Sequence, residues 1–337
     1  MPGPSPQQHD LRDANLVLEG GGVKGVAIIG AVLALDEAGF RFRRVAGTSA
    51  GAIAAALVAA NVAAGKPLAG VRDQIESIDY RRFTAEPATP VGQLRALMKK
   101  LGMHSSEYLV TWLGDILDDI GITKFGQLRR PELGDVFPYS LVVHTTDITR
   151  GRLVRLPPDY AQYGKDPDEQ LIVDAVRASM AIPFYFQPVR VPYQPPANGG
   201  APKPPIEVTW VDGGLLSNFP METFNDRENG VVVDPWHTIG VKLSDSKVAP
   251  RPLDPTDGLI EELHQILKTL LDNSNRYFVT PDKQRGTIFV DSGGVDTTDF
   301  DLDDATRRRL FDNGQQAARD WLVELARFAP ATSSAPT

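Results

Sequence analysis

Short apolar runs alternate with glycine turns and helix-like segments over the first 65 residues. Residues 15–19 and 42–46 each predict a short buried strand. Each run leads through a glycine turn into an apolar segment rich in alanine and valine, which predicts a helix over 26–38 and over 50–64. Two strand–turn–helix units in succession predict a largely parallel sheet.

The rest of the chain continues this alternation of short β runs and helices, which predicts an α/β fold. A Pro- and Gly-rich stretch over 192–205 predicts a surface loop. Strands are predicted over 140–145, 152–156, 206–211, 239–243 and 287–290, and helices over 171–180 and 302–328.

Residues 66–135 differ from their surroundings. Apolar residues recur at helical spacing over 91–101 and 108–120, with Ser105 or Ser106 as N-cap of the second helix. This helical insert fits a cap over an active site or ordinary core packing, because amphipathicity does not separate the two. We expect one domain over 15–328 that contains the insert, with a disordered leader over 1–14 and a disordered tail over 329–337.

Composition narrows the class of function. A net charge of −8 argues against a nucleic-acid partner and against simple electrostatic attraction to an anionic membrane. The chain has no cysteine, which removes disulfides and thiol chemistry. The first residues lack the pattern of a signal peptide and no stretch is apolar enough to span a membrane, so we expect a cytoplasmic protein, peripheral at membranes at most. Nothing indicates an oligomeric state.

The segment Gly47-Thr-Ser49-Ala-Gly51 lies between a predicted strand and a predicted helix. A G-x-S-x-G sequence in that position is typical of a nucleophile elbow, in which a tight turn presents the serine hydroxyl. The following helix begins at Ala50, and its N-terminus favours developing negative charge. The alternative is a tight βα turn with a capping serine.

A glycine-rich loop, Gly20-Gly21-Gly22-Val23-Lys24-Gly25, follows the first predicted strand. Consecutive glycines expose backbone N–H groups, as an oxyanion hole requires. The same letters fit the G-x-G-x-x-G dinucleotide fingerprint. That reading needs an acidic residue at the end of the next strand, where the chain has Val45-Ala-Gly-Thr48 instead.

The third element is Trp210-Val-Asp212-Gly-Gly214, an aspartate at a strand end followed by two glycines. The glycines leave room for another backbone to approach the carboxylate. Taken alone, Asp-Gly favours an Asx-type turn leaving the strand.

In this order, the three elements resemble the patatin-like phospholipase family, which combines a Gly-rich oxyanion loop, a G-x-S-x-G serine and a D-G-[AG] aspartate. The resemblance covers about residues 15–325, with Glu19 where plant members often carry Asp and the 192–205 loop as a local elaboration. Two further segments agree with the family: Ala178-Ser-Met-Ala-Ile-Pro183 and Asp147-Ile-Thr-Arg-Gly151.

The resemblance implies a three-layer α/β/α fold and a Ser–Asp dyad without histidine or cofactor. Ser49 would attack a fatty-acyl ester of a phospholipid, lysophospholipid or related lipid at a membrane or micelle surface, with Asp212 accepting its proton. The N–H groups of Gly21, Gly22 and Val23 would hold the oxyanion, and Lys24 would orient the loop. The alternative is a lipid- or partner-binding regulatory protein with little turnover.

A histidine triad is a further alternative. The order Ser49, Asp212, His237 is permitted in α/β-hydrolases. Against it, that fold usually takes its second oxyanion donor from a loop between strand and helix that lacks the Gly20–Gly25 pattern, and His237 fits a local structural role equally well. We interpret His144, within a predicted strand, as a core residue. The other histidines have no spacing typical of metal ligands, so we expect no metal site: His9, His104 and His264.

Overall fold

The computed structural model describes residues 12–84, 102–133, 137–195, 204–225, 227–228, 231–232, 236–244, 269, 285–295, 299 and 301–328. Most of the predicted leader, the predicted tail and the predicted helix at 91–101 lie outside these residues. The first strand begins at Asp13, so the boundary predicted at residue 14 is too late: Asp13 and Ala14 belong to the strand.

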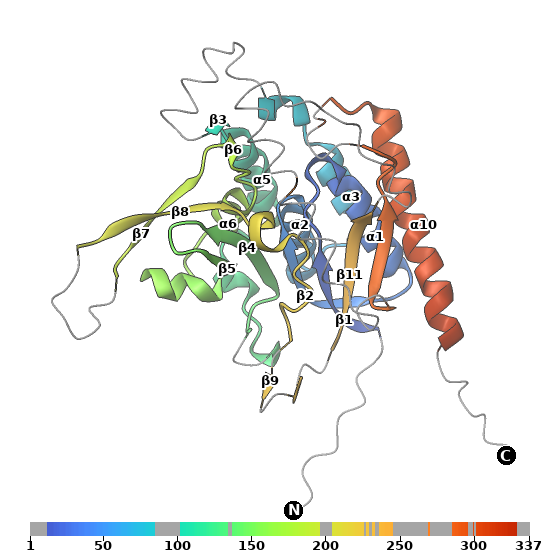
Figure 1. Cartoon of the computed structure of the whole chain (residues 1–337). Coiled ribbons are helices and arrows are strands. Elements are labelled where there is room, and N and C mark those ends of the chain that lie inside the picture. Colours follow the sequence, from blue (N-terminus) through green and yellow to red (C-terminus); the bar gives the residue numbers. More distant parts are fainter. Residues whose placement is uncertain are drawn as a thin grey trace, which may run out of the picture.

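An eight-stranded sheet organises the described part of the chain (Figure 1). Its order is β12-β11-β1-β2-β4-β8-β7, with β5 also paired to β4. The strands from β12 to β4 are parallel to one another, which confirms the predicted largely parallel sheet. Strands β5 and β8 pair antiparallel with β4, and β7 pairs antiparallel with β8. The strands are β1 (Asp13–Leu18), β2 (Arg41–Thr48), β4 (Leu141–Asp147), β5 (Arg152–Leu156), β7 (Val189–Tyr193), β8 (Ile206–Asp212), β11 (His237–Ser244) and β12 (Thr287–Asp291).

Two small strand pairs lie outside this sheet. The first pairs β3 (Gly102–His104) with β6 (Phe184–Phe186), and the second pairs β9 (Arg227–Glu228) with β10 (Val231–Val232). Strand β7 was not predicted, so the expected loop over 192–205 is wrong at its start, where Pro192 and Tyr193 pair with β8. As an edge strand, β7 tolerates a proline that cannot donate a backbone hydrogen bond.

Helices pack mainly against one face of the sheet. Leu16 and Leu18 of β1 point into the larger core with these helices, and Val17 points to a smaller core with Phe224 on the other face. The arrangement is consistent with a three-layer α/β/α fold. The helices are α1 (Gly25–Glu37), α2 (Ala50–Ala63), α3 (Gly70–Glu76), α5 (Glu107–Ile120), α6 (Ile172–Ser179), α7 (Gly214–Ser217) and α10 (Asp304–Phe328), with short 3-10 helices η1 (Gly22–Lys24), η2 (Tyr80–Thr84), η3 (Phe125–Leu128), η4 (Pro131–Leu133) and η5 (Pro158–Tyr163).

Helix α10 lies alongside α1 at one side of the molecule, opposite the β7–β8 hairpin (Figure 1). The two helices approach closely because each has a glycine at the contact. A Cβ on Gly30 would lie 2.1 Å from the carbonyl oxygen of Phe311, and one on Gly314 would lie 1.9 Å from that of Ala27.

In the insert, helix α5 confirms the helix predicted over 108–120. Ser106 is its N-cap residue, but the N–H of Glu107 is accepted by Ser105 Oγ at 3.2 Å. Leu109, Trp112 and Leu113 of α5 are buried in the main core. The described part of the insert is therefore packed into the core. A cap formed by residues 66–135 over the active site stays a prediction.

Strands β2 and β8 meet end to end along one edge of β4. Strand β5 pairs with residues 143–147 of β4, so it occupies the opposite edge. On the shared edge, Thr48 at the end of β2 pairs with His144, and Asp212 at the end of β8 pairs with the next residue, Thr145. The antiparallel strand β8 thus ends where the parallel strand β2 ends. This brings Asp212, the last residue of β8, close to Ser49, which follows β2.

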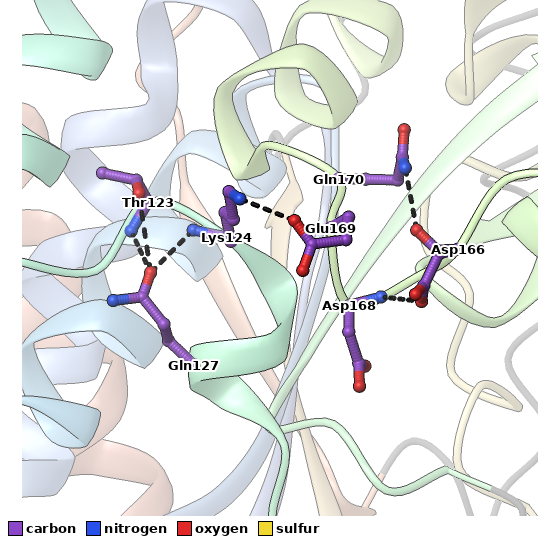
Figure 2. Close-up of polar contacts among 7 residues, drawn as sticks. All are labelled: Thr123, Lys124, Gln127, Asp166, Asp168, Glu169 and Gln170. Carbon is purple, nitrogen blue, oxygen red and sulfur yellow. Dashed lines mark hydrogen bonds and ion pairs between the residues drawn. The ribbon is translucent and has the colours of Figure 1, made fainter.

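The segment that leads into α6 is held by polar contacts with the chain before η3 (Figure 2). Lys124 Nζ lies 2.7 Å from Glu169 Oε2, and Gln127 Oε1 accepts the N–H groups of Thr123 and Lys124. Asp166 accepts the N–H of Asp168 through Oδ1 and the side chain of Gln170 through its backbone carbonyl. These contacts fix the start of the helix whose last residue reaches the elbow.

Candidate active site

Ser49 lies at a strained turn between β2 and α2. Its backbone has φ 53° and ψ −126°, outside the regions that a non-glycine residue favours. A Cβ on Gly47 would lie 2.1 Å from the carbonyl oxygen of Gly51, and one on Gly51 would lie 2.4 Å from that of Leu18. Both glycines of the motif are therefore required by backbone contacts, and the turn has the geometry of a nucleophile elbow.

The glycine-rich loop lies directly against this turn. A Cβ on Gly20 would lie 3.1 Å from Ser49 Cβ, and Gly22 has φ 56°, which favours glycine. The first N–H groups of a helix have no intrahelical acceptor, and in η1 these belong to Gly22 and Val23.

Three N–H groups of the loop are already used. Gly20 donates to the carbonyl of Asn218 at 3.0 Å, Lys24 to that of Gly21 at 3.1 Å, and Gly25 to that of Gly22. Within Gly20–Gly25, the N–H groups left for an oxyanion are those of Gly21, Gly22 and Val23, the three that the resemblance implies. The other three residues shape the loop.

The two carboxylate oxygens of Asp212 have different surroundings. Oδ1 accepts the N–H of Gly214 at 2.7 Å, which is the Asx-type turn considered from the sequence. Oδ2 is buried, and in the described part of the chain it has no partner at ordinary hydrogen-bond geometry. Gly213 is required here, because a Cβ would lie 2.4 Å from the carbonyl oxygen of His144.

Burial raises the pKa of the Asp212 carboxyl to about 7, and hydrogen bonds from the Gly214 N–H and the Ser49 hydroxyl lower it in part. The Ser49 hydroxyl is thus close to the carboxyl. Its Oγ donates to Met180 Sδ at 3.5 Å, and its contact with the carboxyl falls short of ordinary hydrogen-bond geometry. A buried carboxylate with a pKa near neutrality is suited to accept a proton.

Sequence comparison assigns the family. The sequence model of the family described as Patatin-like phospholipase matches residues 16–225, a range that covers more than half of the chain and includes Ser49 and Asp212. The chain belongs to the patatin-like phospholipase family. Membership supports a lipid hydrolase in general terms.

Two curated relatives and one solved structure fit this assignment. The uncharacterized protein YqhO of Bacillus subtilis is 32% identical over 91% of this chain and 97% of its own. An uncharacterized NTE family protein of Mycobacterium tuberculosis is 29% identical over 66% of this chain, which spans 30% of that protein. The crystal structure of VipD from Legionella pneumophila shares the fold with a TM-score of 0.51 and 19% identity, over 92% of this chain and 67% of VipD.

His237 is far from the patatin-like site. It begins β11 and pairs with Ala14, at the amino end of β1, whereas Gly47 pairs with Leu18 at the carboxyl end. The histidine-triad alternative is therefore wrong, because a strand length separates His237 from Ser49.

His144 lies beneath the elbow. Its Nδ1 is 3.4 Å from the carbonyl oxygen of Gly47 and its Nε2 is 3.1 Å from Thr223 Oγ1. Burial lowers the pKa of His144 to about 4, so the ring is neutral at pH 7. The predicted core role fits these contacts.

Ser179 is a supporting residue that the sequence did not single out. Its Oγ accepts the N–H of Ser49 at 2.8 Å and donates to the carbonyl of His144 at 2.6 Å. The segment 178–183, noted only as a point of resemblance, thus holds the elbow from α6. Hydrogen-bond partners this distant in sequence leave no local signal.

Glu19 and Lys242 form a buried ion pair beside the loop. Lys242 Nζ lies 2.5 Å from Glu19 Oε1, and Glu19 Oε2 accepts the N–H of Leu243 at 2.5 Å. Burial raises the pKa of Glu19, and the charge of Lys242 lowers it in part. The pair joins the end of β1 to β11, where Leu243 packs against Gly21.

Within the described residues, no group of three or more histidines and carboxylates is arranged to hold a metal ion. The helices in that same part of the chain lack the combined length and apolarity needed to cross a bilayer.

Proposed function

We propose that the protein is a serine acyl hydrolase in which Ser49 is the nucleophile and Asp212 is the general base. Ser49 Oγ attacks the carbonyl carbon of an ester while its proton passes to Asp212 Oδ2. The tetrahedral intermediate collapses, the C–O bond to the alcohol breaks, and the proton passes from Asp212 to the leaving oxygen. Water then attacks the carbonyl carbon of acyl-Ser49 and gives a proton to Asp212. The bond from this carbon to Ser49 Oγ breaks, Asp212 returns the proton to Ser49 Oγ, and the fatty acid is released.

One observation carries this proposal: a buried carboxylate with a pKa of about 7 lies beside the Ser49 hydroxyl, with Oδ2 not engaged by the turn that holds Oδ1. A carboxyl with an ordinary pKa would be a weaker base, whereas one near the working pH combines ionisation with proton affinity. Neither His144, which is held below the turn, nor His237, which lies at the other end of the strands, is placed to share this role.

The N–H groups of Gly21, Gly22 and Val23 are the proposed oxyanion donors. Loss of one such donor costs roughly 10²–10³ in rate. They follow Gly20, the first residue of the loop, where a Cβ would lie 3.1 Å from Ser49 Cβ.

The proposed substrates are fatty-acyl esters of phospholipids, lysophospholipids or related lipids, presented at a membrane or micelle surface. This follows from family membership and from the burial of Ser49 and Asp212, which excludes water from the reacting groups. The alternative, a binding protein with little turnover, predicts that lipid binds but is released unchanged.

The test is a lipid panel analysed by mass spectrometry, together with labelling by a fluorophosphonate probe. Wild-type protein is expected to release fatty acid and to carry the probe on Ser49. Ser49→Ala should lose both, whereas Ser140→Ala, which removes another buried serine, should keep both. Turnover by Ser49→Ala equal to wild type would refute the proposal, and lipid binding without turnover by wild type would favour the binding protein.

A further inference from the structure

The oxyanion loop is held by a residue that belongs to the aspartate's own connection. Asn218 follows α7, six positions after Asp212 in the sequence. Its Nδ2 donates to the carbonyl of Gly20 at 2.9 Å, and its carbonyl accepts the Gly20 N–H at 3.0 Å. Both backbone polar groups of Gly20 are therefore bound to one residue that lies 198 positions away.

These bonds are buried and closely packed. Asn218 is 9% exposed. A Cβ on Gly20 would lie 2.1 Å from Asn218 Oδ1 on one side and 3.1 Å from Ser49 Cβ on the other. Gly20 is thus in close contact with both the asparagine and the nucleophile, and a shift of the loop would disturb its hydrogen bonds to Asn218.

The same connection is bound to the elbow. Thr48 Oγ1 donates to the carbonyl of Ser217 at 3.3 Å, and Asp212 Oδ1 accepts the N–H of Gly214. The segment 212–218 therefore contacts the elbow through Ser217 and the glycine-rich loop through Asn218, while it supplies the aspartate itself.

We propose that Asn218 is a positioning residue that aligns the Gly21 and Gly22 N–H groups with the oxygen developing on a substrate at Ser49. The inference rests on the proposed function. Asn218 acts through Gly20 and does not touch the reacting atoms. Donors stabilise an oxyanion only when they lie at hydrogen-bond distance from its final position, so a shift of about 1 Å is expected to cost up to about 10²-fold in rate.

The variants Asn218→Ala and Asn218→Asp test this role. Both remove the Nδ2 donor, and the aspartate keeps the size of the side chain. The matched control is Asn61→Ala: Asn61 is also buried and donates to the carbonyl of Leu57 at 2.8 Å, but it lies in the last turn of α2, at the far end from Ser49.

The readouts are kcat and KM on a p-nitrophenyl ester, inhibition by a trifluoromethyl ketone that forms the tetrahedral adduct, and the melting temperature. Each Asn218 variant is expected to lower kcat about 10- to 100-fold with KM within about twofold. Affinity for the ketone should fall in parallel. Asn61→Ala should lower the melting temperature and leave kcat and ketone affinity unchanged. If Asn218 had only a structural role, the Asn218 variants would behave in the same way as Asn61→Ala.

Wild-type kcat and ketone affinity in a folded Asn218 variant would overturn the inference, as would a change confined to KM. If Asn218→Ala does not fold, the isosteric Asn218→Asp decides. The proposed function fails separately, through Ser49→Ala: full turnover in that variant refutes the dyad whatever the Asn218 variants do.

Discussion

Asp13 and Asp212 are two buried aspartates at opposite edges of one sheet. At the amino edge, Asp13 is held by Arg41 at 2.7 Å and Arg43 at 2.9 Å, and the hydrogen bond from Arg41 is the main cause that lowers its pKa to about 2. At the site, Asp212 faces no cation among the described residues that lowers its pKa, and burial raises the pKa to about 7. The fold stabilises the charged form of Asp13 through two arginines, whereas burial destabilises the charged form of Asp212.

The two edges therefore affect stability with opposite signs. Asp13 stabilises the folded state above its unfolded pKa of about 3.8, and this contribution is lost as pH falls toward 2. Asp212 binds its proton more tightly when folded, so the protein loses stability as pH rises from about 4 to about 7. A buried ionisable group whose shifted pKa lowers the stability of the folded state is typical of a functional site.

The largest effect is expected from exchanging the carboxylates for amides. Asp212→Asn removes the base, so kcat/KM should fall by about 10⁴, on the scale of other catalytic aspartates. It also removes the cost of ionising a buried acid, on the order of 4 kcal/mol for a pKa moved from 3.8 to about 7. The variant should therefore melt higher than wild type at pH 8 and similarly at pH 4.

Asp13→Asn is the matched change at the other edge. It should lower the melting temperature at pH 7 and keep kcat/KM, because its partners are Arg41 and Arg43 rather than the site. Equal losses of activity in both variants would remove the distinction between the two edges.

The second comparison sets two glycines of positive φ against each other. Gly22 has φ 56° in the glycine-rich loop, and Gly65 has φ 66° beyond the end of α2, with open space around it. Alanine at either position should cost about 1 kcal/mol in stability, since both adopt left-handed backbone. Only Gly22→Ala should lower kcat, by up to about 10²-fold: alanine keeps the backbone N–H, but strain at this positive φ should displace that proposed oxyanion donor from its position. Chemical denaturation and steady-state kinetics measure the two effects, and similar kcat values would count against the donor role.

The smallest effect is expected at the serines that support the strands. Ser179→Ala leaves the Ser49 N–H without its acceptor and should lower kcat about tenfold, equivalent to one hydrogen bond of about 1.4 kcal/mol. Ser140→Ala removes the bond from Ser140 Oγ to the carbonyl of Leu128, at the start of β4, and should keep kcat. A Ser179 variant with wild-type kcat would mean that the glycine contacts alone hold the elbow.

Local sequence was sufficient to predict Ser49 and Asp212 as candidates. The glycines beside them are required by contacts within a few residues or with the adjacent strand, as at Gly47 and Gly51. Such steric requirements leave a motif in the sequence. The parallel core of the sheet was predictable for the same reason, because β1 and β2 each end in a glycine turn before a helix.

Long-range pairing was not predictable. Periodicity identifies β8 as a strand but does not give its direction, and the end-to-end meeting of β2 and β8 on β4 depends on tertiary register. Ser179 and Asn218 have ordinary neighbours in the sequence, and their roles come from partners more than 100 positions away. The internal use of the Lys24 and Gly25 N–H groups by η1 was not predictable either, because it depends on the conformation of the loop.

The central claim is that Asp212 removes the proton from Ser49. Its most direct test is the rate at which a fluorophosphonate labels Ser49, followed by intact-protein mass spectrometry between pH 5 and pH 9. For wild type, the rate should rise about tenfold per pH unit and level off above about pH 7, where Asp212 is ionised. In Asp212→Asn, labelling should be slow and should lack this inflection. A wild-type rate without an inflection near pH 7, matched by the Asp212→Asn variant, would contradict the account.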